Sequence, residues 1–256
     1  MDLQPVSANG SKSAAVFLPG ILLPADLRYG PLIRELGDSI QAFTKDLEVY
    51  DPGSGQGQYS IDAEIAGLEQ AADRAGLDLF YLYGHSAGGA IALAFAAAQP
   101  DRLLGLALDE PASDFSSASK THWETRLAPT RSLPAAQRLP GFLRAQVSDG
   151  VELPAPAPGL APDWMATRPA GIEAYLIAQE RHVLPAPLSR FAGPVYYSFG
   201  SLSNPYWREL RDRLATAFPS FTSEEYEGLH HLNTSHAAQP ARVATSLQRL
   251  WFSGKT

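Results

Sequence analysis

Residues 82–93 read LYGHSAGGAIAL and place Ser86 between Gly84 and Gly88. An apolar segment precedes the serine and a run of alanine, isoleucine and leucine follows it, so a strand is expected to turn into a helix here. A serine on such a sharp turn, between small neighbours, matches the pattern G-x-S-x-G that carries a catalytic nucleophile. The same residues also fit a glycine-rich turn without chemistry, because the bare pattern arises easily by chance.

Apolar segments of strand length alternate with helical patterns through the first 112 residues. Strands are expected at 14–20, 42–51, 77–84 and 102–112, and helices at 31–40, 60–72 and 88–98. Pro31 suits the first turn of its helix, where the missing N–H has no intrahelical acceptor anyway. Strands separated by helices need crossover connections, which predicts a mostly parallel sheet with helices on both faces.

The composition changes between residues 113 and 190, where prolines become frequent and no strand pattern occurs. Helix-sized pieces remain at 135–147 and 171–181, and LPAPAPGLAP (153–162) is typical of a stiff linker. Strand patterns return at 193–200 and, more weakly, at 220–228, before helices at 207–218 and 239–251. We therefore predict a core formed by residues 1–112 and 191–256, interrupted by a helical insertion at 113–190.

These features together resemble the α/β-hydrolase family. The resemblance rests on the strand and loop VFLPGILL, the turn GHSAGG, the helical insertion after the next strand, and a late histidine before the last helix. It extends over nearly the whole chain. It implies an α/β-hydrolase fold, a doubly wound and mostly parallel sheet with a helical cap at 113–190, and it implies Ser86 as the nucleophile.

A serine hydroxyl is a weak nucleophile and needs an adjacent base. The family's base lies between the last strand and the last helix, where this chain reads GLHHLNTSHAAQP, with His230, His231 and His236. Alignment on the Gly-Leu-His segment of haloalkane dehalogenases selects His230, whereas alignment on the commoner G-x-G-H pattern selects His231. We expect His230 to be the base, with His231 as the alternative, and His236 to pack within the loop.

The base in turn needs a carboxylate that holds its tautomer. In most of the family this acid follows the strand that here reads VYYSFG, but residues 200–207 (GSLSNPYW) contain no Asp or Glu. Some members place the acid after the preceding core strand, which here ends in LALDEPA. This layout favours Glu110, with Asp109 as the alternative. If neither carboxylate is the acid, Asn204 supports the histidine or the serine and histidine act as a dyad.

Acyl transfer also requires hydrogen-bond donors for the oxyanion. By position in the family, the backbone N–H groups of Ala87, after the nucleophile, and Ile21, after the first core strand, are the expected donors. The cap would cover the site and could line it with apolar side chains, for which the candidates are Trp123, Phe142, Trp164, Met165 and Tyr175. Such a pocket favours an uncharged substrate of medium size.

The whole composition excludes several other classes. The net charge is −7 and no Lys/Arg run occurs, so neither a nucleic acid nor an anionic membrane is an expected partner. The longest apolar segment, 90–98, is too short to cross a bilayer. The absence of cysteine excludes a thiolate nucleophile. Residues 1–14 lack the pattern of a signal peptide, so a cytoplasmic location is expected.

The sequence thus predicts a cofactor-independent serine hydrolase. It would cleave a carboxylic ester, lactone or thioester of a small to medium apolar substrate through an acyl-enzyme on Ser86. Hydrolytic C–C cleavage or a lyase-type step with the same residues is the alternative reaction. A ligand-binding receptor that kept the fold is the non-enzymatic alternative.

Overall fold

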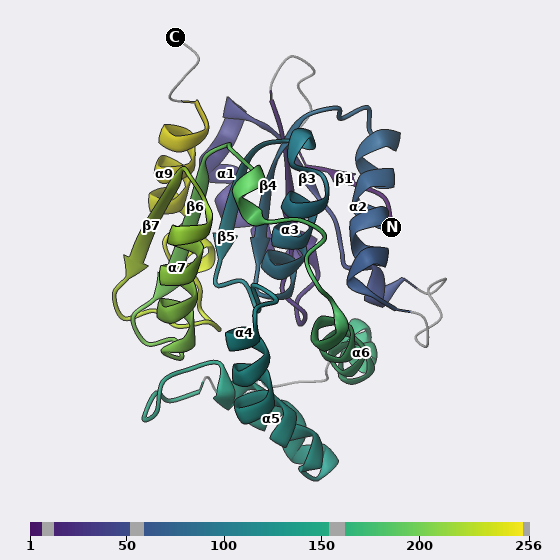
Figure 1. Ribbon diagram of the computed structural model, residues 1–256, viewed down its shortest axis with the longest axis vertical. Helices are drawn as coiled ribbons and strands as arrows, with labels where there is room; N and C mark the ends of the chain where they lie inside the picture. The colour runs from purple at the N-terminus through teal and green to yellow at the C-terminus, as the bar shows by residue number, and fades with distance from the viewer. Residues whose placement is uncertain (7–12, 52–58, 154–161, 253–256) are drawn as a thin grey trace.

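The computed structural model describes residues 1–6, 13–51, 59–153 and 162–252, and within them seven strands form one sheet. The strands are β1 (Gln4–Pro5), β2 (Ala14–Leu18), β3 (Gln41–Thr44), β4 (Phe80–His85), β5 (Leu103–Asp109), β6 (Val195–Gly200) and β7 (Phe221–Tyr226). Their spatial order is β1-β3-β2-β4-β5-β6-β7 (Figure 1). All neighbours pair in parallel except β1, which runs antiparallel to β3. The expected mostly parallel sheet is confirmed.

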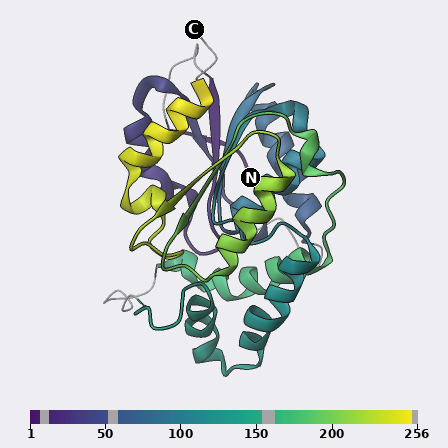
Figure 2. The same cartoon turned by 60° about the vertical axis from the view of Figure 1, so that its left-hand side comes forward.

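Two layers of helices cover the sheet (Figure 2). One layer contains α1 (Ala25–Leu36) and α9 (Pro240–Phe252), and the other contains α2 (Ile61–Arg74), α3 (Ala87–Ala98) and α7 (Tyr206–Ala217). Successive strand residues point to opposite faces. Phe17 therefore packs in the core beneath α1 and α9, whereas its neighbour Val16 packs in the core beneath α2 and α3.

The first helix differs from its predicted position at 31–40. It begins at Ala25 and ends at Leu36, so Pro31 lies inside the helix rather than in its first turn. Proline has no N–H for the carbonyl of Leu27, four residues earlier. Leu27 is exposed, so water can satisfy that carbonyl and the helix continues through Pro31. The predicted strand 42–51 is also shorter, because β3 ends at Thr44.

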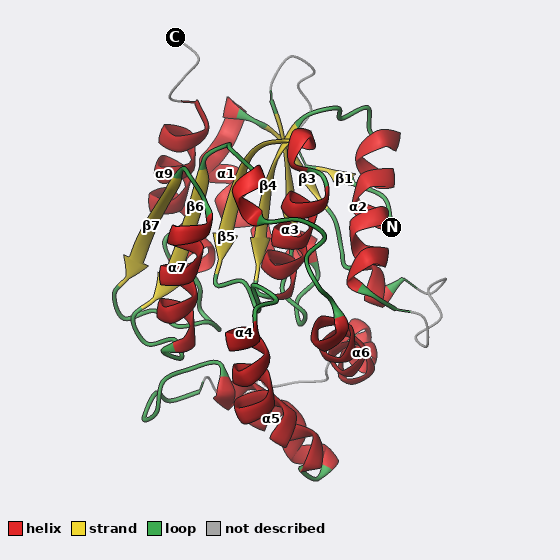
Figure 3. Cartoon of the chain, viewed as in Figure 1, coloured by secondary structure: helices red, strands yellow, loops and turns green. Residues whose placement is uncertain are grey.

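The described part of residues 113–190, which we call the cap segment, contains no strand, and its helices lie beyond the carboxyl ends of the central strands (Figure 3). Its helices are α4 (Ser117–His122), α5 (Ala135–Ala145) and α6 (Arg168–Arg181). Most of the predicted linker at 153–162 lies outside the described residues. A short helix, α8 (Ser235–Ala238), precedes α9 and packs against α1. The carboxyl edge of the sheet and the cap segment together enclose the candidate site.

Candidate active site

Ser86 occupies the sharp turn between β4 and α3. Its backbone has φ 52° and ψ −116°, in a region that non-glycine residues rarely adopt. A Cβ on Gly84 would lie 2.3 Å from the carbonyl oxygen of Gly88, and one on Gly88 would lie 2.5 Å from that of Leu18. Glycine is therefore required at both positions by close backbone approach. A strained serine of this kind costs about 1–3 kcal/mol and is typical of functional sites.

The side chain that reaches Ser86 is His231. Its Nε2 lies 2.9 Å from Ser86 Oγ, and its Nδ1 lies 2.7 Å from Glu110 Oε2. The neutral imidazole with its proton on Nδ1 satisfies both contacts, because Nδ1–H donates to the carboxylate and Nε2 accepts from the hydroxyl. The indole of Trp207 stacks on the imidazole with ring centres 4.3 Å apart and restricts its rotation.

The expectation that His230 faces the serine is wrong. Its backbone N–H donates to Asn233 Oδ1 at 2.6 Å, and its Nδ1 accepts from the backbone N–H of Leu232 at 3.2 Å. These contacts close a tight turn and hold the His230 ring away from Ser86. The next residue along this turn, His231, then projects toward the serine. Burial lowers the pKa of His230, which is consistent with a neutral acceptor in the turn.

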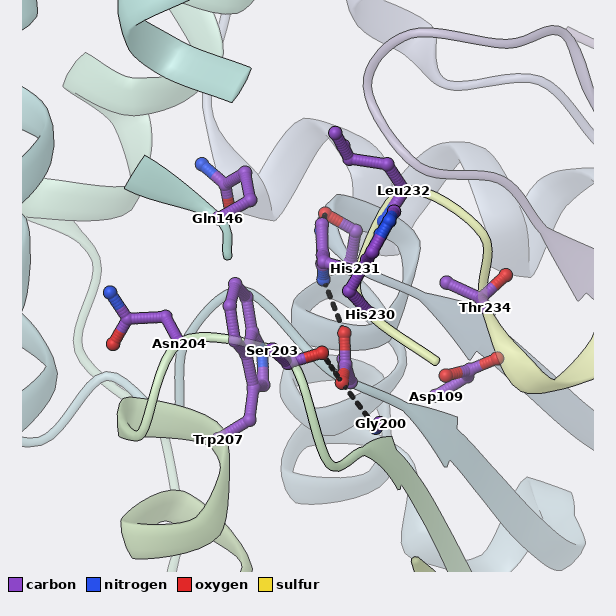
Figure 4. Close-up of polar contacts among 12 residues, drawn as sticks. Asp109, Gln146, Gly200, Ser203, Asn204, Trp207, His230, His231, Leu232 and Thr234 are labelled. Carbon is purple, nitrogen blue, oxygen red and sulfur yellow. Dashed lines mark hydrogen bonds and ion pairs between the residues drawn. The ribbon is translucent and has the colours of Figure 1, made fainter. Parts of the chain in front are cut away.

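Glu110 is the carboxylate at His231, in the position that the relocated-acid layout predicted. It directly follows β5, has a positive φ of 46°, and is almost fully buried. Its Oε1 accepts hydrogen bonds from the backbone N–H of Gly200, at 2.7 Å, and from the hydroxyl of Ser203 (Figure 4). The loop after β6 therefore supplies donors to the carboxylate that follows β5.

Ser203 and Gly200 are functional candidates that the sequence analysis missed. The available signal was the hydroxyl in GSLSN, directly after β6, because β6 pairs with β5 and the two strand ends meet. Asn204, considered as a support for the histidine, instead donates to the carbonyl of Ala145 at 3.1 Å and accepts from the backbone N–H of Tyr206 at 3.0 Å. It makes no hydrogen bond to Ser86, His231 or Glu110.

Asp109 belongs to a second buried network, away from Gln146 and Asn204 (Figure 4). Its Oδ2 accepts from His236 Nδ1 at 2.6 Å and from Ser235 Oγ at 2.8 Å, while Arg28 Nε donates to His236 Nε2 at 2.8 Å. Burial lowers the pKa of His236 to about 4, so the ring is neutral. Burial also opposes ionisation of Asp109, but the hydrogen bonds of His236 and Ser235 outweigh it and lower the pKa of Asp109.

Arg28 connects this network to the turn of Ser86. Its Nη2 lies 3.1 Å from both ring nitrogens of His85, the residue before the serine. Burial lowers the pKa of His85 well below its usual value, and the neighbouring Arg28 acts in the same direction. The ring is therefore neutral. The expectation that His236 packs within its own loop was incomplete, because His236 also bridges α1 to β5.

The two expected oxyanion donors belong to segments that are held in place. Ala87 is the first residue of α3, whose first N–H groups have no acceptor inside the helix. The loop of Ile21 is fixed at two points: Gly88 N–H donates to Pro19 O at 3.0 Å, and the Tyr50 hydroxyl donates to Ile21 O at 2.6 Å. Ile21 and Ala87 both line the space beside Ser86.

A family model described as the alpha/beta hydrolase fold matches residues 44–170. The structure is similar to carboxylesterase CesB from Bacillus subtilis, with 16% identity and a TM-score of 0.64 over 99% of this chain and 92% of that one. It is similar to a hydrolase from Pseudomonas aeruginosa, with 14% identity and a TM-score of 0.70 over 97% of each chain. The chain has the α/β-hydrolase fold.

A third similar structure comes from a study of carboxylesterases of Nitrososphaera gargenis, with 16% identity and a TM-score of 0.71 over 96% of this chain and 91% of that one. No curated protein matches the sequence significantly. Among the described residues, no group of three His, Asp or Glu side chains could hold a metal ion. No helix in the described ranges is long and apolar enough to cross a membrane.

Two small spaces adjoin Ser86. One of about 170 Å³ lies between Ile21, His231 and the cap segment, and another of about 20 Å³ lies beside Ala87 and Tyr175. Phe142 of α5 lines both. Of the five apolar side chains suggested for the pocket, Phe142 and Tyr175 line these spaces, whereas Trp123 is buried in the core.

Proposed function

We propose that this protein is a serine hydrolase that cleaves carboxylic esters through an acyl-enzyme on Ser86. The observation that carries the proposal is the continuous chain from Ser86 Oγ through His231 to Glu110, with 2.9 and 2.7 Å at its two contacts. A strained serine, an imidazole and a buried carboxylate, hydrogen-bonded in this order, form the arrangement that acyl transfer needs. Esterases among the similar structures support the same class of reaction.

In the first half of the reaction, Ser86 Oγ attacks the carbonyl carbon while His231 Nε2 takes the hydroxyl proton. The carbonyl oxygen becomes an oxyanion, which the N–H groups of Ile21 and Ala87 stabilise. The imidazolium is stabilised by Glu110, and His231 then gives its proton to the leaving oxygen. The alcohol departs and the acyl group remains on the serine.

In the second half, water takes the place of the alcohol. His231 removes a proton from the water, the resulting hydroxide attacks the acyl carbon, and the same two N–H groups stabilise the second oxyanion. When the tetrahedral intermediate collapses, Ser86 Oγ recovers its proton from His231 and the acid is released. Proton transfer needs only Ser86, His231 and Glu110. The substrate is a small molecule, and lactones or thioesters can follow the same steps.

The direct test is labelling with a fluorophosphonate probe. We expect the folded protein to be labelled and the Ser86→Ala variant not to be, because the probe traps an activated serine. A panel of p-nitrophenyl esters of increasing acyl length then measures which neutral acyl groups the space beside Ser86 accepts. Folded wild-type protein that neither reacts with the probe nor hydrolyses any ester of the panel would refute the proposal.

A further inference from the structure

A third cavity, of about 500 Å³, lies within the cap segment. Pockets for small molecules usually measure about 300–1,000 Å³, so this cavity has the size that the spaces beside Ser86 lack. Phe142 lines all three spaces, and Ile172 and Leu176 line both this cavity and the smallest space beside Ser86. The cap cavity is therefore separated from Ser86 by the side chains of a few apolar residues.

The charged side chains of this cavity are mostly positive. Arg131, Arg138 and Arg168 line it with a single acid, Glu173, which is exposed. The protein as a whole carries a net charge of −7, so the positive charge of this cavity is opposite in sign to that of the protein. A cavity of this charge attracts an anion.

Two of the arginines have buried donors that lack an acceptor. Nε and Nη2 of Arg131 and Nε of Arg168 are buried without a hydrogen-bond partner among the described residues. Arg168 as a whole is only 5% exposed. A buried N–H of a charged group without a partner is costly, so unmet donors at a cavity wall indicate the place of a ligand oxygen.

Aromatic rings support the faces of the same two guanidinium groups. Arg168 lies 3.7 Å from the ring centre of Tyr50 and 5.1 Å from that of Trp164, and Arg131 lies 5.0 Å from that of Trp123. Stacking stabilises the planar cation through its face and leaves the N–H groups on its edge for other partners. Carboxylate and phosphate oxygens fit such an edge with paired hydrogen bonds.

We propose that the substrate carries an anionic oxygen group, a carboxylate or a phosphate, which binds to Arg131, Arg138 and Arg168 in the cap cavity. The apolar middle of the substrate passes Phe142, and its ester lies at Ser86. This inference rests on the proposed hydrolase function and replaces the uncharged substrate that the sequence suggested. Arg168 also connects the cap cavity to the oxyanion loop. It stacks on Tyr50, and the Tyr50 hydroxyl donates a hydrogen bond to the carbonyl of Ile21 in that loop.

The first test is competitive inhibition of p-nitrophenyl acetate hydrolysis by octanoate, octyl phosphate and octanol, which share one apolar chain. We expect octanoate, octyl phosphate or both to inhibit at concentrations at least tenfold lower than octanol, since a charge-assisted hydrogen bond is worth about tenfold to a hundredfold in affinity. The two anions compared with each other identify the preferred group. Octanol as potent as both anions would overturn the proposal.

Arginine variants locate the anion. Arg131→Gln and Arg138→Gln should each weaken inhibition by the preferred anion about tenfold or more and leave inhibition by octanol within about twofold. The matched control is Arg181→Gln, an exposed arginine of the same cap segment that does not line the cavity. Unchanged octanol inhibition shows that a variant remains folded. Equal anion inhibition in all three variants and the wild type would refute the site.

Substrates then connect the cavity to Ser86. We expect mono-p-nitrophenyl esters of the dicarboxylic acids, over chain lengths from four to ten carbons, to exceed the matching monocarboxylic esters in kcat/KM at one or more lengths. That ratio should fall in Arg131→Gln but not in Arg181→Gln. A ratio near one at every length would overturn the proposal. If the proposed function itself fails, no ester is hydrolysed, and calorimetric binding of octanoate still tests the cavity separately.

Discussion

Replacing Glu110 with glutamine should inactivate the protein while the size and shape of the side chain stay the same. Gly200 N–H and the Ser203 hydroxyl both donate to Oε1 of Glu110, so the oxygen of the new amide must take that position. The amide NH₂ then faces His231 Nδ1, where the carboxylate oxygen lies 2.7 Å away in the wild type. Because NH₂ only donates, Nδ1 must become the acceptor and the imidazole proton moves to Nε2.

A proton on Nε2 leaves His231 unable to accept the proton of Ser86. We expect kcat for a p-nitrophenyl ester to fall about 10⁴-fold, or about 5 kcal/mol in activation free energy, as for other histidines held in the wrong tautomer. The value of KM should change little, because Glu110 lies behind the imidazole and does not contact the substrate. Stopped assays with purified variant and a thermal melt measure both quantities and the fold.

The matched control is Asp109→Asn, which changes the preceding buried carboxylate in the same way. Asp109 binds His236 and Ser235, and neither of these contacts Ser86 in the structure. This variant should lose about 1.5–3 kcal/mol of stability, as expected when hydrogen bonds to a buried charged group are weakened, with kcat within about tenfold of the wild type. A near-normal kcat in Glu110→Gln together with a severe loss of kcat in Asp109→Asn would refute the assignment.

Three further predictions test other contacts of the site. His231→Ala should lower kcat about 10⁴-fold and His230→Ala less than tenfold; the reverse order in a steady-state assay would restore His230 as the base. Ser203→Ala should lower kcat about tenfold at unchanged KM, because Glu110 loses one charge-assisted donor; a kcat equal to the wild type would show that this donor is dispensable. The folded state keeps His236 neutral down to about pH 4, whereas the unfolded chain protonates it below pH 6.5. The unfolded state therefore binds more protons at this position, and His236 alone should account for a fall in stability of about 3 kcal/mol between pH 6.5 and pH 4 in urea titrations. This contribution should be absent in His236→Asn, and equal slopes in the two proteins would contradict the pKa assignment.

The serine turn could be predicted from the sequence because it depends on local geometry. Close backbone approach admits only glycine at 84 and 88, and the apolar runs on both sides specify a strand and a helix. The choice between His230 and His231 does not depend on the glycines or on the apolar runs. It is decided by the direction of each side chain in a turn closed by Asn233 and Leu232, and family patterns pointed to both residues.

The position of Glu110 was predicted from the layout of some family members, whereas its hydrogen bonds from Gly200 and Ser203 were not predicted. An empty position after β6 directed attention to Glu110, but the hydroxyl of Ser203 in that same loop was read only as the absence of a carboxylate. Parallel pairing of β5 and β6 places the two strand ends side by side. A hydroxyl at one strand end and a carboxylate at the next should therefore be treated as candidate partners when the usual acid is missing.

The alternation of side chains along β5 explains why the neighbouring acids Asp109 and Glu110 serve different histidines. Ala107 packs in the core beneath α1 and α9, and Asp109, two residues later, points to the same face, where it meets His236. Glu110 follows the end of the strand, and its positive φ turns it out of this alternation toward His231. Asp109 through His236 and Arg28 then supports the strained turn at His85 from the α1 side. Glu110 acts on the imidazole from the other side. Asp109 thus contributes to the stability of the fold around the turn, whereas Glu110 holds the tautomer of His231, and the paired variants at 109 and 110 should separate loss of stability from loss of activity.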